Sequence, residues 1–251
     1  MNHTKLKTFT ILTIVGVSIL LIGDFKAKTE ILNVDGDLSY PNDLDAYYWN
    51  PHVFQRVSDW SIKFTDKVTM YLKSASIDAG HIATGIWWNK AIEGGEKIPL
   101  NQRLTVVFDI RLVKVSYSED AWVRIALAAA FYSPSLDRVY YTELDVWDSP
   151  AAMSHPNGNI NEGGKIVYSG GNVVEYKLDQ IEVGEWRHYE VDLTDLIHST
   201  WRSKARDGVL ESVYIVIEVI GSSEVEVEVD NMWLIKYSYN PLEALLSLKS
   251  W

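Results

Sequence analysis

Residues 140–150 (YYTELDVWDSP) place acidic and aromatic side chains at alternating positions. As a β-strand, this segment points four side chains to one face: Tyr141, Glu143, Asp145 and Trp147. Two carboxyl groups on one face repel each other, and burial raises the pKa of a carboxyl, so the two can take different protonation states. The same pattern also fits a solvated strand face with scattered acids. The neighbouring aromatic rings favour a cleft.

A second acidic segment lies near the C-terminus, at residues 213–237. Glu218 stands inside an apolar strand-like run, which is an unusual place for a charge. Glu224 follows a Gly-Ser-Ser break, where a bulge can aim a side chain into a groove. Either glutamate is therefore a candidate partner for Glu143.

Most enzymes that cleave a glycosidic bond use two carboxyl groups, one on each side of a groove. One attacks the anomeric carbon or activates water, and the other protonates the leaving oxygen. The sequence is rich in Trp and Tyr, whose flat rings with polar tips suit a groove for hydroxylated ligands. The rings predicted to line such a groove are Trp87, Trp88, Trp122, Tyr141 and Trp147.

Other chemistries find no support in the sequence. The chain has no cysteine, which excludes disulfides, thiol nucleophiles and zinc sites of the cysteine type. The six histidines form no metal-binding pattern, and no phosphate-binding or dinucleotide-binding motif is present. The formal net charge of −11 argues against a nucleic-acid partner. We therefore expect no metal and no cofactor.

The elements that must hold these residues are strands. Nine or more β-branched or aromatic runs alternate with period two and are separated by turn residues. Helix is expected only within residues 193–206 and in the tail. This pattern predicts an all-β fold, a two-sheet antiparallel β-sandwich of the jelly-roll, concanavalin-like type, over residues 46–240, followed by a tail at residues 241–251.

The N-terminus has the features of an export signal. Lys5 and Lys7 precede an uncharged apolar run at residues 8–23, which predicts a hydrophobic helix. Residues 1–23 are expected to be a signal peptide or, if they are not cleaved, a membrane anchor, and residues 24–45 a polar linker. The protein is then extracellular, secreted or anchored to the outer face of the membrane. Any membrane contact is through this segment alone.

Several segments together resemble the concanavalin-like jelly-roll endoglucanases, most closely glycoside hydrolase family 12 in its archaeal form. The resemblance rests on YYWNP at 47–51, GIWWNK at 85–90, TELDVWD at 142–148, and VYIVIEVIGSSE followed by MWLIKY at 213–237. It implies that Glu143 is the nucleophile of a retaining enzyme, with Glu224 or alternatively Glu218 as acid/base. Asp145 would modulate the nucleophile, and Trp147 would line the cleft.

The leading hypothesis is a secreted endo-β-1,4-glucanase-like enzyme that cleaves neutral β-glucans such as cellulose, mixed-linkage glucan or xyloglucan. Residues 185–196 and 228–237 also look like the late strands of jelly-roll carbohydrate-binding modules, which need no acid/base pair. A non-catalytic binding module is therefore an alternative, and a cell-surface structural or adhesive protein is a third. In the first two cases the partner is a polysaccharide.

Overall fold

A computed structural model describes residues 28–31, 50–55, 59–75, 79–87, 98–153, 158–161, 165–168 and 171–238. The chain forms two compact units. One consists of the two chain ends, Met1–Thr29 and Tyr237–Trp251, and the other is Glu30–Lys236. The second unit contains the two sheets and the candidate site. The first short strand, β1, spans Lys28–Ile31.

The smaller sheet combines two long strands, of 15 and 16 residues, with shorter ones. Its order is β13 (Trp186–Asp192), β7 (Arg103–Tyr117), β15 (Ser223–Ser238), β4 (Val68–Ser74) and β3 (Asp59–Phe64). Alternation is clear in β15, where Val225, Val227 and Val229 are buried while the glutamates between them point away from the core. One face of this sheet therefore packs on the core, and the other faces outward.

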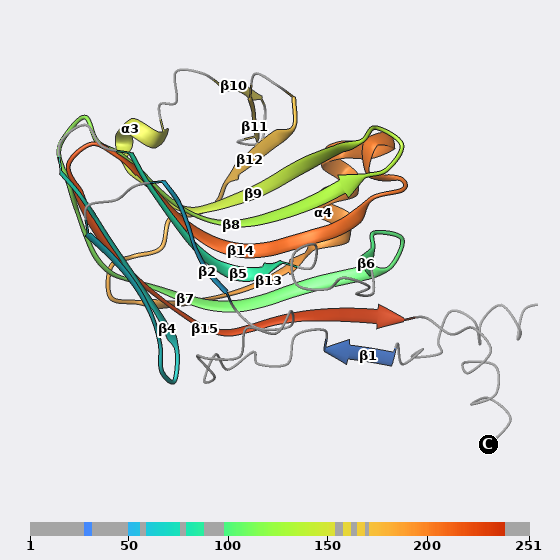
Figure 1. The fold of residues 1–251 in the computed structure, drawn as a ribbon, viewed down its shortest axis with the longest axis horizontal. Coiled ribbons are helices and arrows are strands. Elements are labelled where there is room, and N and C mark those ends of the chain that lie inside the picture. Colours follow the sequence, from blue (N-terminus) through green and yellow to red (C-terminus); the bar gives the residue numbers. More distant parts are fainter. Residues whose placement is uncertain are drawn as a thin grey trace, which may run out of the picture. The chain divides into compact units, whose positions relative to one another are not determined.

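The larger sheet carries the acidic segments found in the sequence. Its order is β10 (Gly158–Asn161), β11 (Lys165–Tyr168), β12 (Val173–Lys177), β9 (Arg138–Asp148), β8 (Trp122–Ser133), β14 (Val209–Ile220), β5 (Ala79–Trp87) and β2 (Asn50–Gln55). A short strand, β6 (Ile98–Pro99), also pairs with β14. Neighbours pair antiparallel except β12 and β9, which run parallel. Figure 1 shows β5, β14, β8 and β9 side by side in a curved layer.

The core fills the space between the two sheets. Phe108 and Ile110 of β7 belong to the same buried apolar cluster as Ile125 and Leu127 of β8. The side of the larger sheet that faces away from this core is concave in Figure 1, and it is called the concave face below. The core side chains thus fix which residues of each strand reach the concave face.

Helices are short and few among the described residues. Helix α4 (Leu193–Trp201) continues into a 3-10 turn (Arg202–Ala205), within the range that the sequence predicted. The Asp192 side chain caps α4 by accepting a hydrogen bond from the Asp195 amide at 3.0 Å. Trp201 ends the helix and donates to Thr142 Oγ1 at 2.9 Å, which ties α4 to β9. A further turn of helix, α3 (Pro150–Met153), follows β9.

The predicted fold class, an all-β sandwich of the jelly-roll type, is confirmed. The parallel pairing of β12 with β9 was not expected from the sequence. The predicted N-terminal hydrophobic helix at residues 8–23 lies outside the described residues. No helix within the described ranges has the length and apolar character needed to cross a lipid bilayer.

Candidate active site

The concave face is assembled from four strands with matching alternation. On β8, Ile125 and Leu127 face the core, so Arg124, Ala126 and Ala128 face the other way. On β9, Leu144 faces the core and its neighbours Glu143 and Asp145 face the concave side. Glu218 on β14 and His81 on β5 join them from the far side of β8. Residues far apart in the sequence are thereby collected on one surface.

Small residues make room for the charged side chains above the centre of this sheet. Ala83, Ala126 and Ala128 form a second buried cluster with Tyr214 and Val216, on the opposite side of the sheet from the main core. In the register, Ala128 lies opposite Glu143, and Ala126 lies opposite Asp145. An alanine leaves the space above it to the longer side chain on the neighbouring strand.

One glycine is required by the same packing. Gly85 on β5 lies opposite Tyr214 on β14. A Cβ atom at Gly85 would stand 2.2 Å from the Tyr214 Cβ atom, far inside van der Waals contact. Gly85 therefore allows the aromatic ring of Tyr214 to sit on the concave face.

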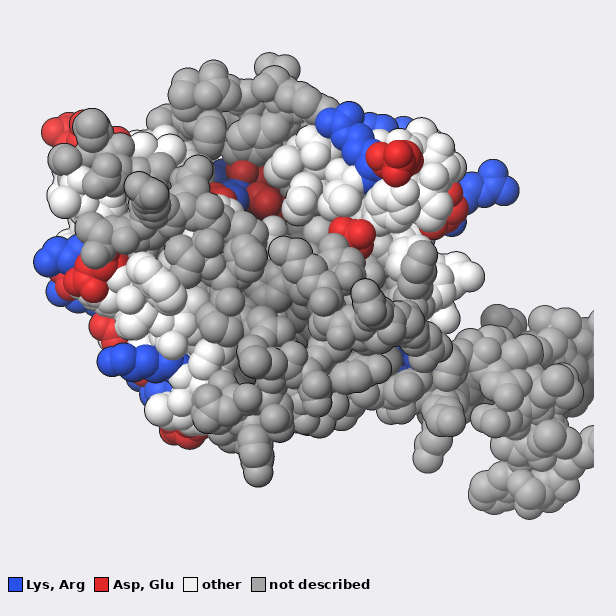
Figure 2. Space-filling model, viewed as in Figure 1, with Lys and Arg blue, Asp and Glu red and all other residues white. Residues whose placement is uncertain are grey.

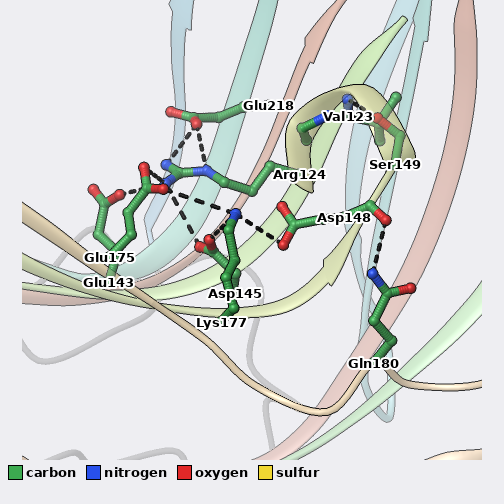
Figure 3. A network of polar contacts seen from close by, with 11 residues as sticks. Val123, Arg124, Glu143, Asp145, Asp148, Ser149, Glu175, Lys177, Gln180 and Glu218 are labelled. Atoms are coloured by element: carbon green, nitrogen blue, oxygen red, sulfur yellow. Dashed lines mark hydrogen bonds and ion pairs between the residues drawn. The ribbon is translucent and has the colours of Figure 1, made fainter. Parts of the chain in front are cut away.

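Arg124 is the centre of the site, and its side chain is only 3% exposed. Its Nε atom donates to Glu218 Oε2 at 2.8 Å, and its Nη2 atom lies 2.5 Å from the same oxygen. Its Nη1 atom donates to Glu143 Oε2 at 2.6 Å and also to Glu175, with Asp145 Oδ1 3.6 Å away. Figure 3 shows the four carboxyl groups arranged around the guanidinium.

Lys177 supplies a second positive charge beside the first. Its Nζ atom lies 2.5 Å from Asp145 Oδ2, 2.9 Å from Asp148 Oδ2 and 3.9 Å from Glu175 Oε2. Lys177 and Glu175 come from β12, whose parallel register places them beside Asp145 and Glu143 of β9. Strand β12 therefore completes the site from the edge of β9.

A bulge in β9 explains why Asp148 reaches the same network. Ala126 of β8 pairs with Asp145 of β9, and the preceding residue of β8, Ile125, pairs with Trp147. Val146 is therefore an extra residue in β9. Beyond such a bulge the alternation of side chains changes phase. Asp148 consequently lies opposite Arg124 on the concave side. The Gln180 side-chain amide donates a hydrogen bond to the backbone carbonyl of Asp148 at 2.9 Å.

The network carries three more carboxylates than cations, and burial makes this imbalance costly. Burial raises the pKa of the Glu143 carboxyl; Arg124 opposes the rise, whereas Glu218 and Asp145 add to it. Burial, together with Asp145, raises the pKa of Asp148 to about 6 even though Lys177 acts against it. Burial alone would lower the pKa of Lys177, but Asp145 and Asp148 outweigh it and the pKa is raised.

Two of the candidate carboxyls remain partly open to solvent. The Glu218 side chain is 19% exposed and the Glu143 side chain 10% exposed, whereas Glu175 is 4% exposed. Figure 2 shows acidic and basic side chains at the bottom of a hollow in this view of the molecule. Glu143 and Glu218 are therefore the carboxyls of the network best placed to meet a ligand.

The structure brings together Glu143, Asp145 and Glu218, as the alternative sequence prediction expected. It does not bring Glu224 to them. Glu224 lies on β15 of the smaller sheet, where it pairs with Lys114 at 2.7 Å and accepts from the Tyr71 hydroxyl at 3.2 Å. It points away from the core on the outer face of that sheet, so the prediction that Glu224 faces Glu143 across a groove is wrong.

The predicted aromatic lining is only partly found on the concave face. Trp122 lies there beside Arg124, with 5.6 Å between the centroid of its ring and the guanidinium carbon. Tyr141 lies on the same face of β9 as Glu143. Trp147 does not, because the bulge turns it into the main core, where it packs edge-on to Tyr117. Its predicted role in the cleft is therefore wrong. Trp88 and the side chain of Trp87 lie outside the described residues.

Four residues of the network were not predicted from the sequence: Arg124, Asp148, Glu175 and Lys177. Glu175 and Lys177 are two residues apart in the short run VVEYKL, so both point to one face of a strand. This pattern is too short to indicate a site by itself, and the two residues join the site because β12 pairs with β9. Arg124 is a single charge in an otherwise apolar strand, the same kind of anomaly that singled out Glu218. Within the described ranges, no group of three or more acidic or histidine side chains is arranged to hold a metal ion.

The two curved sheets form a jelly-roll β-sandwich that is similar in fold to solved structures of glycoside hydrolase families 11 and 12. A solved family 12 endoglucanase derived from a metagenome matches 86% of this chain and 100% of its own, with a TM-score of 0.54 and 12% identity. The family 11 xylanase from Neocallimastix patriciarum matches 84% of this chain and 100% of its own, with a TM-score of 0.52 and 10% identity. No protein-family model and no curated protein sequence matches the chain. At these identities the likeness concerns the fold.

Proposed function

We propose that the protein is a retaining glycoside hydrolase that cleaves neutral β-glucans, with Glu143 and Glu218 as its catalytic carboxyl groups. The supporting observation is their position: they project from β9 and β14 onto one concave face and are joined by a single guanidinium. Glycoside hydrolysis needs two carboxyls near the scissile bond, about 5–5.5 Å apart in retaining enzymes. Glu218 thus takes the place that the resemblance first gave to Glu224.

The charge of the site supports a neutral substrate. The network already holds more carboxylates than cations, so a glycan carboxylate would add repulsion in a poorly solvated place. Hydroxyl groups, by contrast, can donate hydrogen bonds to these carboxylates without a charge penalty. Cellulose oligomers, mixed-linkage glucan and xyloglucan are substrates of this kind. The family 12 protein of the same fold is an endoglucanase, which agrees with this class.

Release of reducing ends from lichenan and xyloglucan by the purified protein tests this proposal. We expect Glu143→Gln and Glu218→Gln each to lower the rate by at least about 100-fold, because each removes a group that acts in the transition state. Glu226→Gln, on the outer side of β15, is the matched control and keeps the wild-type rate. The anomer formed first, read by proton NMR, reports retention. Wild-type protein without activity on either glucan would refute the proposal.

A second candidate is a carbohydrate-binding protein without hydrolysis. One observation favours it: the guanidinium of Arg124 stands between the two carboxyls and bonds both. Such a protein would bind the same glucans with similar affinity in the wild type and in Glu143→Gln. Measured affinity together with absent product formation separates this candidate from the first.

We also propose that the protein acts outside the cell. The basis is the sequence of residues 1–23, with two lysines ahead of an apolar run. Detection of the protein in the medium or on the cell surface, and mass spectrometry of its N-terminus, test this placement and show whether the segment is removed.

A further inference from the structure

Trp186 on β13 is an exposed tryptophan on the outer side of the smaller sheet. It pairs with Arg111 of β7, and the neighbours of Arg111 along that strand, Ile110 and Leu112, lie in the main core. Alternation therefore points Trp186 and Arg111 away from the core. Trp186 is 42% exposed. A single exposed aromatic residue is common on protein surfaces, so the surroundings of the ring decide what it can do.

Two cations cover one face of the Trp186 ring. The guanidinium carbon of Arg111 lies 5.0 Å from the ring centroid, and Lys67 Nζ lies 6.0 Å from it. Both cations bind the Glu228 carboxyl group, Lys67 at 2.9 Å and Arg111 through Nε at 2.8 Å and through Nη2. Two cations held by one carboxyl group are too close together to lie on opposite faces of a ring at these distances. They therefore share one side of the ring and leave the opposite face to solvent.

A set of fixed polar side chains lies beside the ring. His188 is two residues along β13 from Trp186, on the same face, and its Nδ1 atom lies 2.7 Å from Asp109 Oδ1. Asn231 donates from Nδ2 to the other oxygen of Asp109 at 2.8 Å. His188 is 60% exposed in its side chain, and Asn231 is also exposed. The second polar atom of each, Nε2 of His188 and Oδ1 of Asn231, can therefore bond a ligand.

The charges of this region are already paired with one another. Glu228 is bound by Lys67 and Arg111, and Asp109 is bound by His188 and Asn231. A charged ligand would have to displace one of these partners, whereas a neutral ligand would not. The region is therefore complementary to a neutral molecule that has a flat apolar face and a polar edge.

A β-linked glucan chain has this shape. The hydroxyl groups of β-glucose are equatorial, so each sugar ring has two apolar C–H faces and a rim of hydroxyl groups. One C–H face can lie on the open side of the Trp186 ring. The hydroxyl rim then meets the polar atoms of His188 and Asn231.

We propose that Trp186, His188, Asp109 and Asn231 form a second glucan-binding surface, called the outer glucan surface, on the side of the smaller sheet that faces away from the core. It performs no chemistry and does not depend on hydrolysis at the concave face. Its ligand is a neutral β-1,4-glucan chain. Because it lies on the other sheet, the protein can hold an insoluble glucan here while the concave face remains free for a second chain.

Proton–nitrogen NMR of the tryptophan indole groups tests the surface without any need for activity. With cellohexaose as the ligand, the Trp186 signal, assigned with Trp186→Phe, is expected to shift as the ligand is added. Trp60 on β3 is the matched control, because it is 43% exposed but pairs with the core residue Leu72 and so lies on the other side of its sheet. The Trp186 shift is expected to persist in Trp122→Ala, which alters the concave face. An unchanged Trp186 signal at millimolar ligand, or loss of the shift in Trp122→Ala, would overturn the proposal.

Retention on insoluble cellulose provides a second test. Trp186→Ala is expected to weaken binding about tenfold, whereas Trp60→Ala binds like the wild type. Retention is expected to be equal in low and high salt, because the ligand forms no ion pair. Equal losses in the two tryptophan variants, or release of the protein by salt, would contradict a neutral glucan at Trp186.

Two further measurements separate this proposal from its alternatives. Trp186→Ala is expected to hydrolyse a soluble aryl β-cellobioside at the wild-type rate, so a protein that cleaves nothing refutes the proposed function and leaves the NMR result to decide the outer glucan surface. Sedimentation velocity over a range of protein concentrations tests for a second copy of the chain as the occupant. A dimer that disappears in Trp186→Ala, with no response of the Trp186 signal to cellohexaose, would overturn the glucan assignment.

Discussion

Glu143 and Glu175 are direct register partners on the parallel strands β9 and β12, and a single nitrogen atom of Arg124 bonds the carboxyl of each. Like charges placed opposite each other on neighbouring strands destabilise a sheet. Here the shared nitrogen compensates for the repulsion, because it lies between the two carboxyls. The ionisation of either glutamate therefore depends on the other.

Glu175→Gln is expected to lower the pKa of Glu143, because it removes a neighbouring negative charge and leaves more of the Arg124 donor to Glu143. The limb of the kcat/KM profile that reports Glu143 then moves to lower pH. Carbon-13 titration and the pH profile measure the two effects. Glu190→Gln on the exposed side of β13 is the control, and a Glu143 midpoint that rises in Glu175→Gln would contradict the expectation.

Arg124→Met is expected to lower the free energy of unfolding by about 3–5 kcal/mol at pH 7, because it leaves buried carboxylates without their counter-charge. Lys114→Met removes a surface ion pair with Glu224 and is expected to cost less than about 1 kcal/mol. Urea unfolding of both variants provides the comparison. Equal losses would show that burial of the Arg124 network contributes little.

Glu224→Gln is expected to leave glucan hydrolysis unchanged, because Glu224 lies on the outer side of the smaller sheet with Lys114 and Tyr71. Glu218→Gln, on the concave face, is expected to abolish it. Initial rates on lichenan under identical conditions distinguish the two positions. A large loss in Glu224→Gln would return that residue to the site and contradict the geometry.

Asp148 is expected to make stability depend on pH between about 4 and 6. Its pKa is raised in the folded protein from the ordinary value of 3.8 to about 6, so the native state binds this proton more tightly than the unfolded chain. The stability that the proton provides is fully present below pH 4 and is lost as pH rises through 6. Urea unfolding at intervals across this range should show the loss in the wild type.

Two variants isolate the contribution of Asp148. Asp148→Asn cannot ionise, so its stability should not decline in this way over the same range. Asp179→Asn, whose native side chain is 93% exposed, should follow the wild type. A wild-type profile parallel to that of Asp148→Asn would mean that Asp148 does not titrate here.

Two tryptophans test the distinction between core and site. Trp147→Ala is expected to cost about 3–5 kcal/mol of stability, because it empties a large volume in the main core. Trp122→Ala is expected to weaken glucan binding about tenfold, equivalent to about 1.4 kcal/mol, because a flat ring beside the carboxyl pair is lost. Calorimetric titration with cello-oligosaccharides and thermal unfolding measure both. The reverse pattern would restore Trp147 to the cleft.

The sequence predicts the strands well because alternation is a local property. Thus β9 and β14 were recognised from their own residues, and Glu218 was identified from its apolar neighbours alone. The helix at residues 193–201 was predicted for the same reason. What these elements share is that no information about partners is needed to recognise them.

The composition of the site could not be predicted in the same way, because it depends on register and sheet membership. Glu224 and Glu218 are six residues apart, yet the turn between β14 and β15 carries them into different sheets. Glu175 joins Glu143 only because β12 pairs parallel to β9 after a long connection. No local pattern in either segment records that pairing.

The extra residue at Val146 gives β9 two different phases along its length. Before it, every second residue reaches the concave face; after it, the count is displaced by one, so aspartate occupies a position that tryptophan would otherwise fill. A regular strand that kept Val146 would exchange Trp147 and Asp148 between the interior and the concave surface, whereas deletion of Val146 would remove the bulge and leave both side chains on their present sides. The pairing of one extra residue in this strand, rather than the composition of the strand, thus separates a charged wall opposite Arg124 from an aromatic one.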